Sequence, residues 1–429
     1  MTPRLLAIIG SGETTPTMAR VHRALLDRLG EGPVRAVLLD TPYGFQDNAD
    51  DTTERALAYF RDTVGRRFSV ASLRTAQLER LERETALARV READYLFSGP
   101  GSPSYALRQW TATEIPGLLA AKLTSGGIVV LASAAALTIG SLTVPVYEIY
   151  KAGEAPRWLP GLDLLSAIGL TVAVIPHYDN AEGGSHDTRY CYLGERRLQV
   201  LEAELPEDAF ILGIDGHTAL VLDLDAHRAT VLGLGGVTVR RGGRSVVLPS
   251  GTELEIDQLR AAAFRERPTS APARQSADAH PAPTGSPYAR REAMTPLREE
   301  VAALERVFGQ ALIASDLPSA VRTILGLDAS LLAWSRDTEE SNDLDEARAA
   351  FRAMIVRLGE AAAPAGRDPA ALVAPFVDAL IDLRTRARTA GDWEAADAIR
   401  DRLEVAGIEL HDAPASTSWE LQHEPARTG

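Results

Sequence analysis

The sequence predicts an α/β fold, a mostly parallel sheet covered by helices on both faces, followed by a separate all-helical domain. Two observations lead to this prediction. In the first 262 residues, short β-branched and aliphatic runs alternate with longer stretches that have helical apolar spacing. Runs that are apolar on both faces are typical of parallel strands buried between helices. From residue 295 onward, the apolar spacing is helical almost throughout.

Six runs are predicted to form the strands of the sheet. They are LLAIIG (5–10), VRAVLLD (34–40), FSVASL (68–73), DYLFSG (94–99), GIVVLA (127–132) and LTVAVIP (170–176). Residues 208–249 then alternate short apolar runs with Asp and Gly turns. This pattern indicates antiparallel hairpins added to one edge of the sheet.

A chain of 429 residues is longer than one hydrophobic core usually supports, so two domains are expected. A segment rich in Pro, Ala, Ser and Arg divides the chain and is predicted to be a linker. The predicted parts are a first domain (1–262), the linker (263–294), a helical domain (295–421) and a tail (422–429). The helices of the second domain are expected near 297–315, 318–335, 343–361, 369–390 and 392–406, before a small hairpin.

The net charge of −14 disfavours a broad nucleic-acid or anionic membrane surface, because phosphates repel such a field. A single cysteine, Cys191, allows no internal disulfide and no Cys/His cluster for structural zinc. No metal or cofactor is expected. The apolar stretches fall short of the roughly 20 residues that span a bilayer, and the start lacks a secretion signal. A cytoplasmic protein without membrane contact is therefore expected.

Chemistry-bearing residues follow the predicted strands, at the edge where parallel sheets bind ligands. Ser133 follows the fifth run and His177 the sixth. A serine at a sharp strand-to-helix turn has an exposed hydroxyl, and the next N–H, from Ala134, points where an oxyanion forms. His177 would take the serine proton. A second oxyanion donor is expected from the glycine loop at Gly99 and Gly101, since Pro100 between them has no N–H, and Gly101 is the favoured donor.

A carboxylate must orient the histidine. Sequence position alone does not choose between the three candidates, which are Glu148, Asp179 and Asp187. The alternative for Ser133 is a packing residue between alanines, and His177 alone could be structural. Their joint placement at one sheet edge favours an acyl-transfer site.

The motifs of the first domain, taken in order, resemble the dipeptidase E and cyanophycinase family of serine peptidases. They are GSGE, FSGPGSPSYALRQ, GGIVVLASAAAL, IPHYDNAEGGSHDTRYCYLGERR, LGIDGHTALVLD and VTVRRGG, spread over most of residues 1–250. The resemblance implies a fold like that of class I glutamine amidotransferases. It also implies hydrolysis of a small peptide or amide substrate, with Ser133 as nucleophile, His177 as base and Glu148 as the acidic member.

The substrate-binding residues expected at this site are Glu13, Asp179, Asp187 and Arg189, although Asp187 and Arg189 could equally pair with each other. The chain departs from the family pattern at three positions. Leu131 and Ala135 stand where the family has glycines around the serine, and Gly216 stands where a glutamate is common. A catalytically decayed adaptor is therefore the alternative function. Association into a homo-oligomer is left open.

The second half resembles the C-terminal helical region of cysteinyl-tRNA synthetases, over roughly residues 296–421. DWEAADAIRDRL followed by GIEL carries the resemblance most specifically. The HIGH and KMSKS motifs are missing, so this chain is not expected to charge tRNA. A weak tRNA contact is one interpretation, and hydrolysis of an aminoacyl or peptidyl bond on RNA another. Arginine–aspartate surface pairs are the alternative for the basic residues, which are Arg384, Arg386, Arg388, Arg400 and Arg402.

Overall fold

The computed structural model of the protein describes residues 2–181, 186–264, 296–335, 337, 343–362, 369–413 and 416–421. It divides into two compact units, one of Met1–Val307 with Arg322–Arg352 and one of Phe308–Val321 with Ala353–Gly429. The predicted tail (422–429) and the predicted linker lie outside the described residues, except that 263 and 264 end a helix. The predicted domain boundaries stay predictions.

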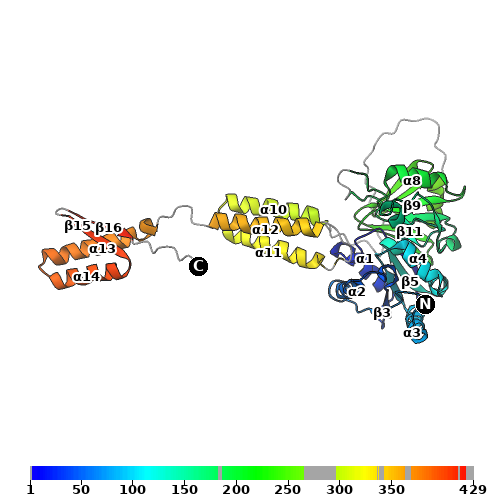
Figure 1. The fold of residues 1–429 in the computed structure, drawn as a ribbon, viewed down its shortest axis with the longest axis horizontal. Coiled ribbons are helices and arrows are strands. Elements are labelled where there is room, and N and C mark those ends of the chain that lie inside the picture. The colour runs from blue at the N-terminus through cyan, green and yellow to red at the C-terminus, as the bar shows by residue number, and fades with distance from the viewer. Residues whose placement is uncertain are drawn as a thin grey trace. The chain divides into compact units, whose positions relative to one another are not determined.

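The larger sheet of the first unit has eight strands in the order β14-β11-β10-β1-β5-β4-β2-β3. Figure 1 labels β3, β5 and β11 among them. The first five predicted runs form its parallel part, where β1 pairs with β5, β5 with β4, β4 with β2 and β2 with β3. On its other side, β1 pairs antiparallel with β10. The strands are β1 (Arg4–Ile9), β2 (Ala36–Leu39), β3 (Ser69–Ala71), β4 (Tyr95–Ser98), β5 (Gly127–Ala132), β10 (Thr218–Asp223), β11 (Arg228–Gly233) and β14 (Glu253–Glu255).

The sixth predicted strand belongs to a second sheet, which the sequence did not indicate. That sheet has the order β13-β12-β9-β8-β6-β7 and is also mixed, since β8 pairs parallel with β9 and β9 antiparallel with β12. An apolar run specifies a buried strand but not its neighbour, so the pattern could not separate the two sheets. The strands are β6 (Leu142–Thr143), β7 (Leu159–Pro160), β8 (Val172–Ile175), β9 (Phe210–Ile214), β12 (Gly236–Arg241) and β13 (Arg244–Pro249).

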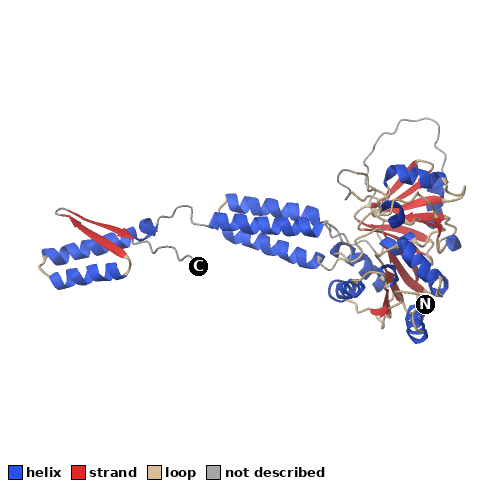
Figure 2. Ribbon diagram, viewed as in Figure 1, coloured by secondary structure: helices blue, strands red, loops and turns tan. Residues whose placement is uncertain are grey.

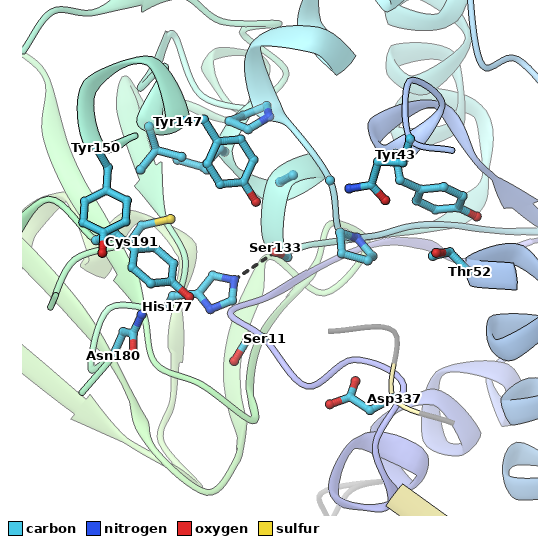
Figure 3. Close-up of a pocket in the computed structure, with 18 of the residues that line it drawn as sticks. Ser11, Tyr43, Thr52, Ser133, Tyr147, Tyr150, His177, Asn180, Cys191 and Asp337 are labelled. Carbon is cyan, nitrogen blue, oxygen red and sulfur yellow. Dashed lines mark hydrogen bonds between the residues drawn. The ribbon is translucent and has the colours of Figure 1, made fainter. Parts of the chain in front are cut away.

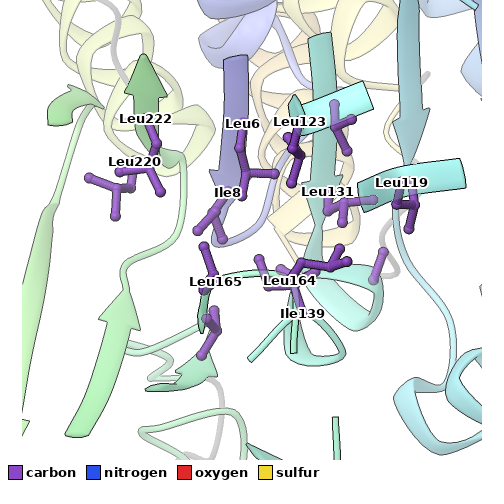
Figure 4. Close-up of a cluster of buried hydrophobic side chains, with 14 of the residues drawn as sticks. Leu6, Ile8, Leu119, Leu123, Leu131, Ile139, Leu164, Leu165, Leu220 and Leu222 are labelled. Atoms are coloured by element: carbon purple, nitrogen blue, oxygen red, sulfur yellow. The ribbon is translucent and has the colours of Figure 1, made fainter. Parts of the chain in front are cut away.

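Helices cover both faces of the larger sheet, as predicted. Alternate residues of β1 enter two different cores: Leu6 and Ile8 pack in one cluster, and Leu5 and Ile9 in the other. Figure 4 shows the first cluster, with Leu131 of β5 inside it. The helices of this region are α1 (Pro16–Asp27), α2 (Ala49–Ala58), α3 (Arg80–Glu92), α4 (Pro103–Thr111), α5 (Ile115–Ser125), α6 (Ser133–Leu137), α7 (Val146–Tyr150), α8 (Gly194–Ala203) and α9 (Ile256–Phe264), with short turns at Thr41–Tyr43, Tyr59–Val64 and Ser166–Ile168.

The five helices predicted after residue 295 are all present. They are α10 (Leu297–Ile313), α11 (Leu317–Trp334), α12 (Asp343–Ala362), α13 (Pro369–Thr389) and α14 (Trp393–Val405). The predicted hairpin follows as β15 (Ile408–Ala413) and β16 (Ser416–Leu421), and Figure 2 shows it beside α13 and α14. Val377, Leu403 and Ile408 form their shared core. Among the described helices, none is long and apolar enough to cross a membrane.

Candidate active site

Ser133 stands at the turn between β5 and α6, where the sequence predicts a nucleophile. β5 ends at Ala132 and α6 begins at Ser133, whose φ is +48°. A left-handed φ is strained for a residue with a Cβ, and such strain clusters at functional sites. The Oγ atom of Ser133 lies 2.9 Å from Nε2 of His177 (Figure 3). The structure therefore joins the two residues by a hydrogen bond.

His177 follows β8 of the second sheet and also has a φ of +48°. Its carbonyl oxygen accepts hydrogen bonds from the N–H groups of Asn180 and Cys191. The bond from Asn180 closes a turn at His177, and the bond from Cys191 ties this turn to a later segment of the chain. The serine and the histidine thus come from two different sheets, and the site lies where their strand ends meet.

The glycine loop after β4 packs directly on the serine turn. The carbonyl of Gly99 accepts a hydrogen bond from the N–H of Ala135, at 3.2 Å. Gly101 has a φ of +134°, and a Cβ there would lie 2.1 Å from the carbonyl oxygen of Pro42. Gly101 and Ala134 line the same pocket as Ser133 and His177. Because Ala134 lies in the first turn of a helix, its N–H has no acceptor within that helix.

Glu148 lies on α7, and its carboxylate contacts the start of α4, directly after the glycine loop. Oε1 accepts a 2.5 Å hydrogen bond from the hydroxyl of Ser104, which lies 3.1 Å from that of Ser102. Oε2 is buried and has no hydrogen-bond partner among the described residues. The carboxylate therefore ties α7 to the start of α4. An orienting role for Glu148 on the histidine stays a prediction.

The remaining predicted substrate contacts differ in position. Asp179 lines the pocket, and its Oδ1 accepts a 2.7 Å hydrogen bond from the N–H of Gly216. Asp187 and Arg189 form a two-bond ion pair of 2.8 and 2.9 Å, and this guanidinium holds the pKa of Asp187 well below its usual range. The carboxylate of Glu13 is buried behind the glycine loop, 2.8 Å from where a Cβ on Gly99 would stand.

The three departures from the family pattern are accommodated by the fold. Leu131 and Ala135 are both fully buried in the first core cluster, and neither lines the pocket of Ser133. Figure 4 shows Leu131 in this cluster. A Cβ on Gly216 would lie 3.0 Å from Ser11 Oγ and 3.5 Å from Asp179 Oδ1. Asp179 therefore places a carboxylate close to the position that a side chain at 216 would occupy.

The pocket also contains residues that the sequence interpretation missed. It has a volume of about 750 Å³. His217 lines it and has a lowered pKa, because burial disfavours the charged ring more than nearby Asp179 favours it. Ser11, Trp334 and Asp337 line it as well. His217 directly precedes the antiparallel strand β10, and Trp334 ends a distant helix, so the rule about parallel strand ends could not select them.

Asp215 precedes Gly216, whose N–H binds the pocket residue Asp179, and its carboxyl group has a raised pKa. Burial, with a smaller contribution from Asp179, raises the pKa of Asp215 to about 6, although the N–H of Gly236 donates to its Oδ2 at 2.7 Å. Within the described residues, no group of three or more His, Cys, Asp or Glu side chains is placed to hold a metal ion.

In the second unit, three of the five arginines that the sequence analysis considered for tRNA contact form ion pairs with aspartates. Arg384 is 5% exposed and holds Asp412 through two hydrogen bonds of 2.6 and 2.7 Å. Arg388 reaches the same carboxylate at 3.2 Å. Arg400 lies 3.5 Å from Asp397. Much of the positive charge on these helices is therefore balanced locally.

Comparison with known proteins finds two separate similarities, and no family model matches the chain. The chain is 54% identical over 43 residues to a cysteine-tRNA ligase of Shewanella baltica, which is 10% of this chain and 9% of the ligase. It is 39% identical over 69 residues to that of Arthrobacter sp., 16% of this chain and 14% of the ligase. The chain thus spans only about a tenth of the length of these relatives.

Two solved structures are similar to the chain over more than half its length. A peptidase from an acI-B1 actinobacterium is 21% identical, with a TM-score of 0.48, over 59% of this chain and 97% of that one. A peptidase E-type protein from Listeria monocytogenes is 14% identical, with a TM-score of 0.35. The match covers 58% of this chain and 99% of the Listeria chain. Both similarities suggested by the sequence motifs are thus found. Neither determines what this chain does.

Proposed function

We propose that the protein is a serine hydrolase that cleaves a peptide or amide bond in a small substrate. The observation that supports this most is the 2.9 Å contact between Ser133 Oγ and His177 Nε2, in a pocket that Gly101 and Ala134 also line. A nucleophile, a base and backbone donors within one pocket are what acyl transfer requires.

In the proposed reaction, Ser133 Oγ attacks the carbonyl carbon of the scissile bond while His177 Nε2 takes the hydroxyl proton. The oxyanion receives hydrogen bonds from the N–H groups of Gly101 and Ala134. His177 then gives its proton to the leaving amine, and the carbon–nitrogen bond breaks to leave an acyl-serine ester. Water, deprotonated by His177, attacks this ester and releases the acid, and the proton returns to Ser133.

Glu148 enters this proposal in two ways. As the acidic member of a triad it would orient the imidazole of His177, as the family resemblance implies. Its hydrogen bond to Ser104 supports another role, in which it holds the start of α4 and thereby the glycine loop that carries Gly101. We propose the second role, since Ser104 is its hydrogen-bond partner among the described residues.

The test is covalent labelling with a fluorophosphonate probe, which reacts with an activated serine. The wild type should be labelled, and Ser133→Ala and His177→Ala should both lose the label. Ser11→Ala is the matched control, because Ser11 lines the same pocket, and it should keep the label. A folded wild type that resists the probe would favour the adaptor interpretation instead.

A second proposal is that the part of the chain formed by α13, α14 and the β15–β16 hairpin binds RNA weakly. Trp393 is 61% exposed, and the guanidinium of Arg388 lies 6.0 Å from its ring centroid. An exposed aromatic ring beside an arginine offers a stacking surface for a base. A gel shift with tRNA at low salt tests this, and Trp393→Ala should weaken any shift. No shift at any protein concentration contradicts it.

A further inference from the structure

One wall of the serine pocket comes from outside the two sheets. Trp334, the last residue of α11, and Asp337 line the pocket together with Ser133 and His177. All four residues belong to the same compact unit. Trp334 and Asp337 are each only 5% exposed. This wall is therefore a packed part of the unit.

The indole of Trp334 rests against a histidine that is itself fixed. The rings of Trp334 and His217 meet edge to face, with centroids 5.7 Å apart and planes at 69°. Nδ1 of His217 lies 2.8 Å from the hydroxyl of Thr17. The backbone N–H of His217 donates to the carbonyl of Ser11, at 3.1 Å. The indole is thus anchored to the same side of the pocket as Ser11.

Hydrogen bonds with Thr14, Arg55 and Trp334 help to hold Asp337 at the pocket. The hydroxyl of Thr14 donates to its Oδ1 at 3.2 Å, and Arg55 donates to its carbonyl oxygen at 3.1 Å. Its own N–H donates to the carbonyl of Trp334 at 3.0 Å, so the two residues form one turn. Figure 3 shows the Asp337 carboxylate directed toward the pocket.

The lining of the pocket suits a positively charged group. Its charged residues are Asp47, Asp179, Asp337, Asp343, Arg55 and Lys151. With neutral histidines this is four negative and two positive charges, a net of −2. Aromatic rings from Tyr147, Tyr150 and Trp334 stand among them, and the face of an aromatic ring attracts a cation. Arg189, which was expected to contact the substrate or to pair with Asp187, pairs with Asp187 and is not part of this lining.

We propose that Trp334 and Asp337 select the substrate of this pocket by binding its positively charged amino group. The cation would lie against the indole, with the Asp337 carboxylate beside it. The inference rests on the proposed function for the bond that is cleaved. It concerns binding, however, and a binding measurement can test it without turnover.

The experiment is calorimetric titration of the full chain carrying Ser133→Ala, which prevents hydrolysis of the probes. The probes are alanyl-alaninamide, whose amino group is charged at pH 6, and its N-acetyl derivative, which carries no charge. We expect the charged probe to bind at least about tenfold more tightly. Adding Asp337→Asn should remove most of that preference. Asp345→Asn is the matched control, because its side chain is 79% exposed and lies outside the pocket, and it should leave the preference intact.

Equal affinity for the two probes, no binding of either, or a preference that survives Asp337→Asn each overturns the proposal. Trp334→Ala should weaken binding of the charged probe, and Trp334→Phe should restore part of it, because phenylalanine also presents an aromatic face. The fluorophosphonate result stays separate. If the wild type is not labelled but the charged probe still binds more tightly than the acetylated one, the proposed hydrolase is rejected. The proposed binding of an amino group by Trp334 and Asp337 is then retained.

Discussion

The hydroxyl oxygen of Ser133 lies 2.9 Å from Nε2 of His177, although the two residues are 44 positions apart and follow strands of different sheets. Both have a φ of +48°. Each strained residue costs on the order of 1–3 kcal/mol, which the surrounding packing must offset. This pair of strained residues at hydrogen-bond distance is the observation on which the proposed nucleophile and base rest.

Glu148→Gln should lower the rate of fluorophosphonate labelling by about tenfold or less. The amide can still accept the hydrogen bond from Ser104, so the glycine loop should keep most of its position. If Glu148 instead orients His177, the loss should approach about 10⁴-fold, as for the carboxylate of a serine-protease triad. Second-order labelling rates separate the two roles.

Gly101→Ala should reduce labelling by roughly 10²-fold or more, because moving the Gly101 N–H away from the oxyanion has an effect similar to the loss of one donor. The new Cβ would lie 2.1 Å from the carbonyl of Pro42, so the loop must move. Gly65→Ala is the control for the backbone cost alone. Its φ is +85°, and nothing lies within 4 Å of its added Cβ. Normal labelling of Gly101→Ala would remove Gly101 from the oxyanion site.

Asp215→Asn should stabilise the fold at neutral pH and leave it unchanged near pH 4. Burial raises the pKa of Asp215 to about 6, above the unfolded value of 3.8, so the fold prefers the protonated form. Its stabilising contribution is present below the unfolded pKa and is lost as the pH rises through about 6. Asparagine keeps the acceptor for Gly236 without the charge.

Melting temperatures of wild type and Asp215→Asn should therefore diverge between about pH 4 and pH 6 and run parallel above that range. His217 titrates in the opposite sense in both proteins, because its lowered pKa makes the fold lose stability as the pH falls below the unfolded value of 6.5. A constant difference at all pH values would contradict the prediction.

Asp412→Asn should destabilise the C-terminal unit by on the order of 2 kcal/mol, because it removes the counter-charge from nearly buried Arg384. Thermal unfolding of the full chain, followed through the transition of this unit, measures the effect. Asp397→Asn is the control. It removes an exposed pair with Arg400, which should contribute less than about 1 kcal/mol. If both substitutions lowered the stability equally, the burial of Arg384 would not determine how much its ion pair contributes.

Leu131→Gly, the change toward the family pattern, should destabilise the fold by about 3 kcal/mol or more, because it empties a fully buried position and frees the backbone. Leu81→Ala is the control, since Leu81 is 80% exposed and should shift stability by no more than about 0.5 kcal/mol. Denaturant titration measures both. Unchanged stability with faster labelling would mean that Leu131 obstructs the serine turn.

The sequence by itself determined the elements that local patterns encode. Apolar spacing located the five C-terminal helices, and the first five runs became the parallel strands of one sheet. Ser133 and His177 were selected because both follow strands. These features depend on residues close together in the chain, whose period directly reflects which face is buried.

The tertiary structure alone decided which strands pair and which side chains meet. It placed β8 in a second sheet, set Glu148 against Ser104, and paired Arg189 with Asp187. It also brought Trp334 and Asp337 to the pocket of Ser133. Such contacts join residues far apart in sequence and depend on packing shape over a few ångströms. A one-dimensional pattern of apolar and polar residues carries no information at that scale.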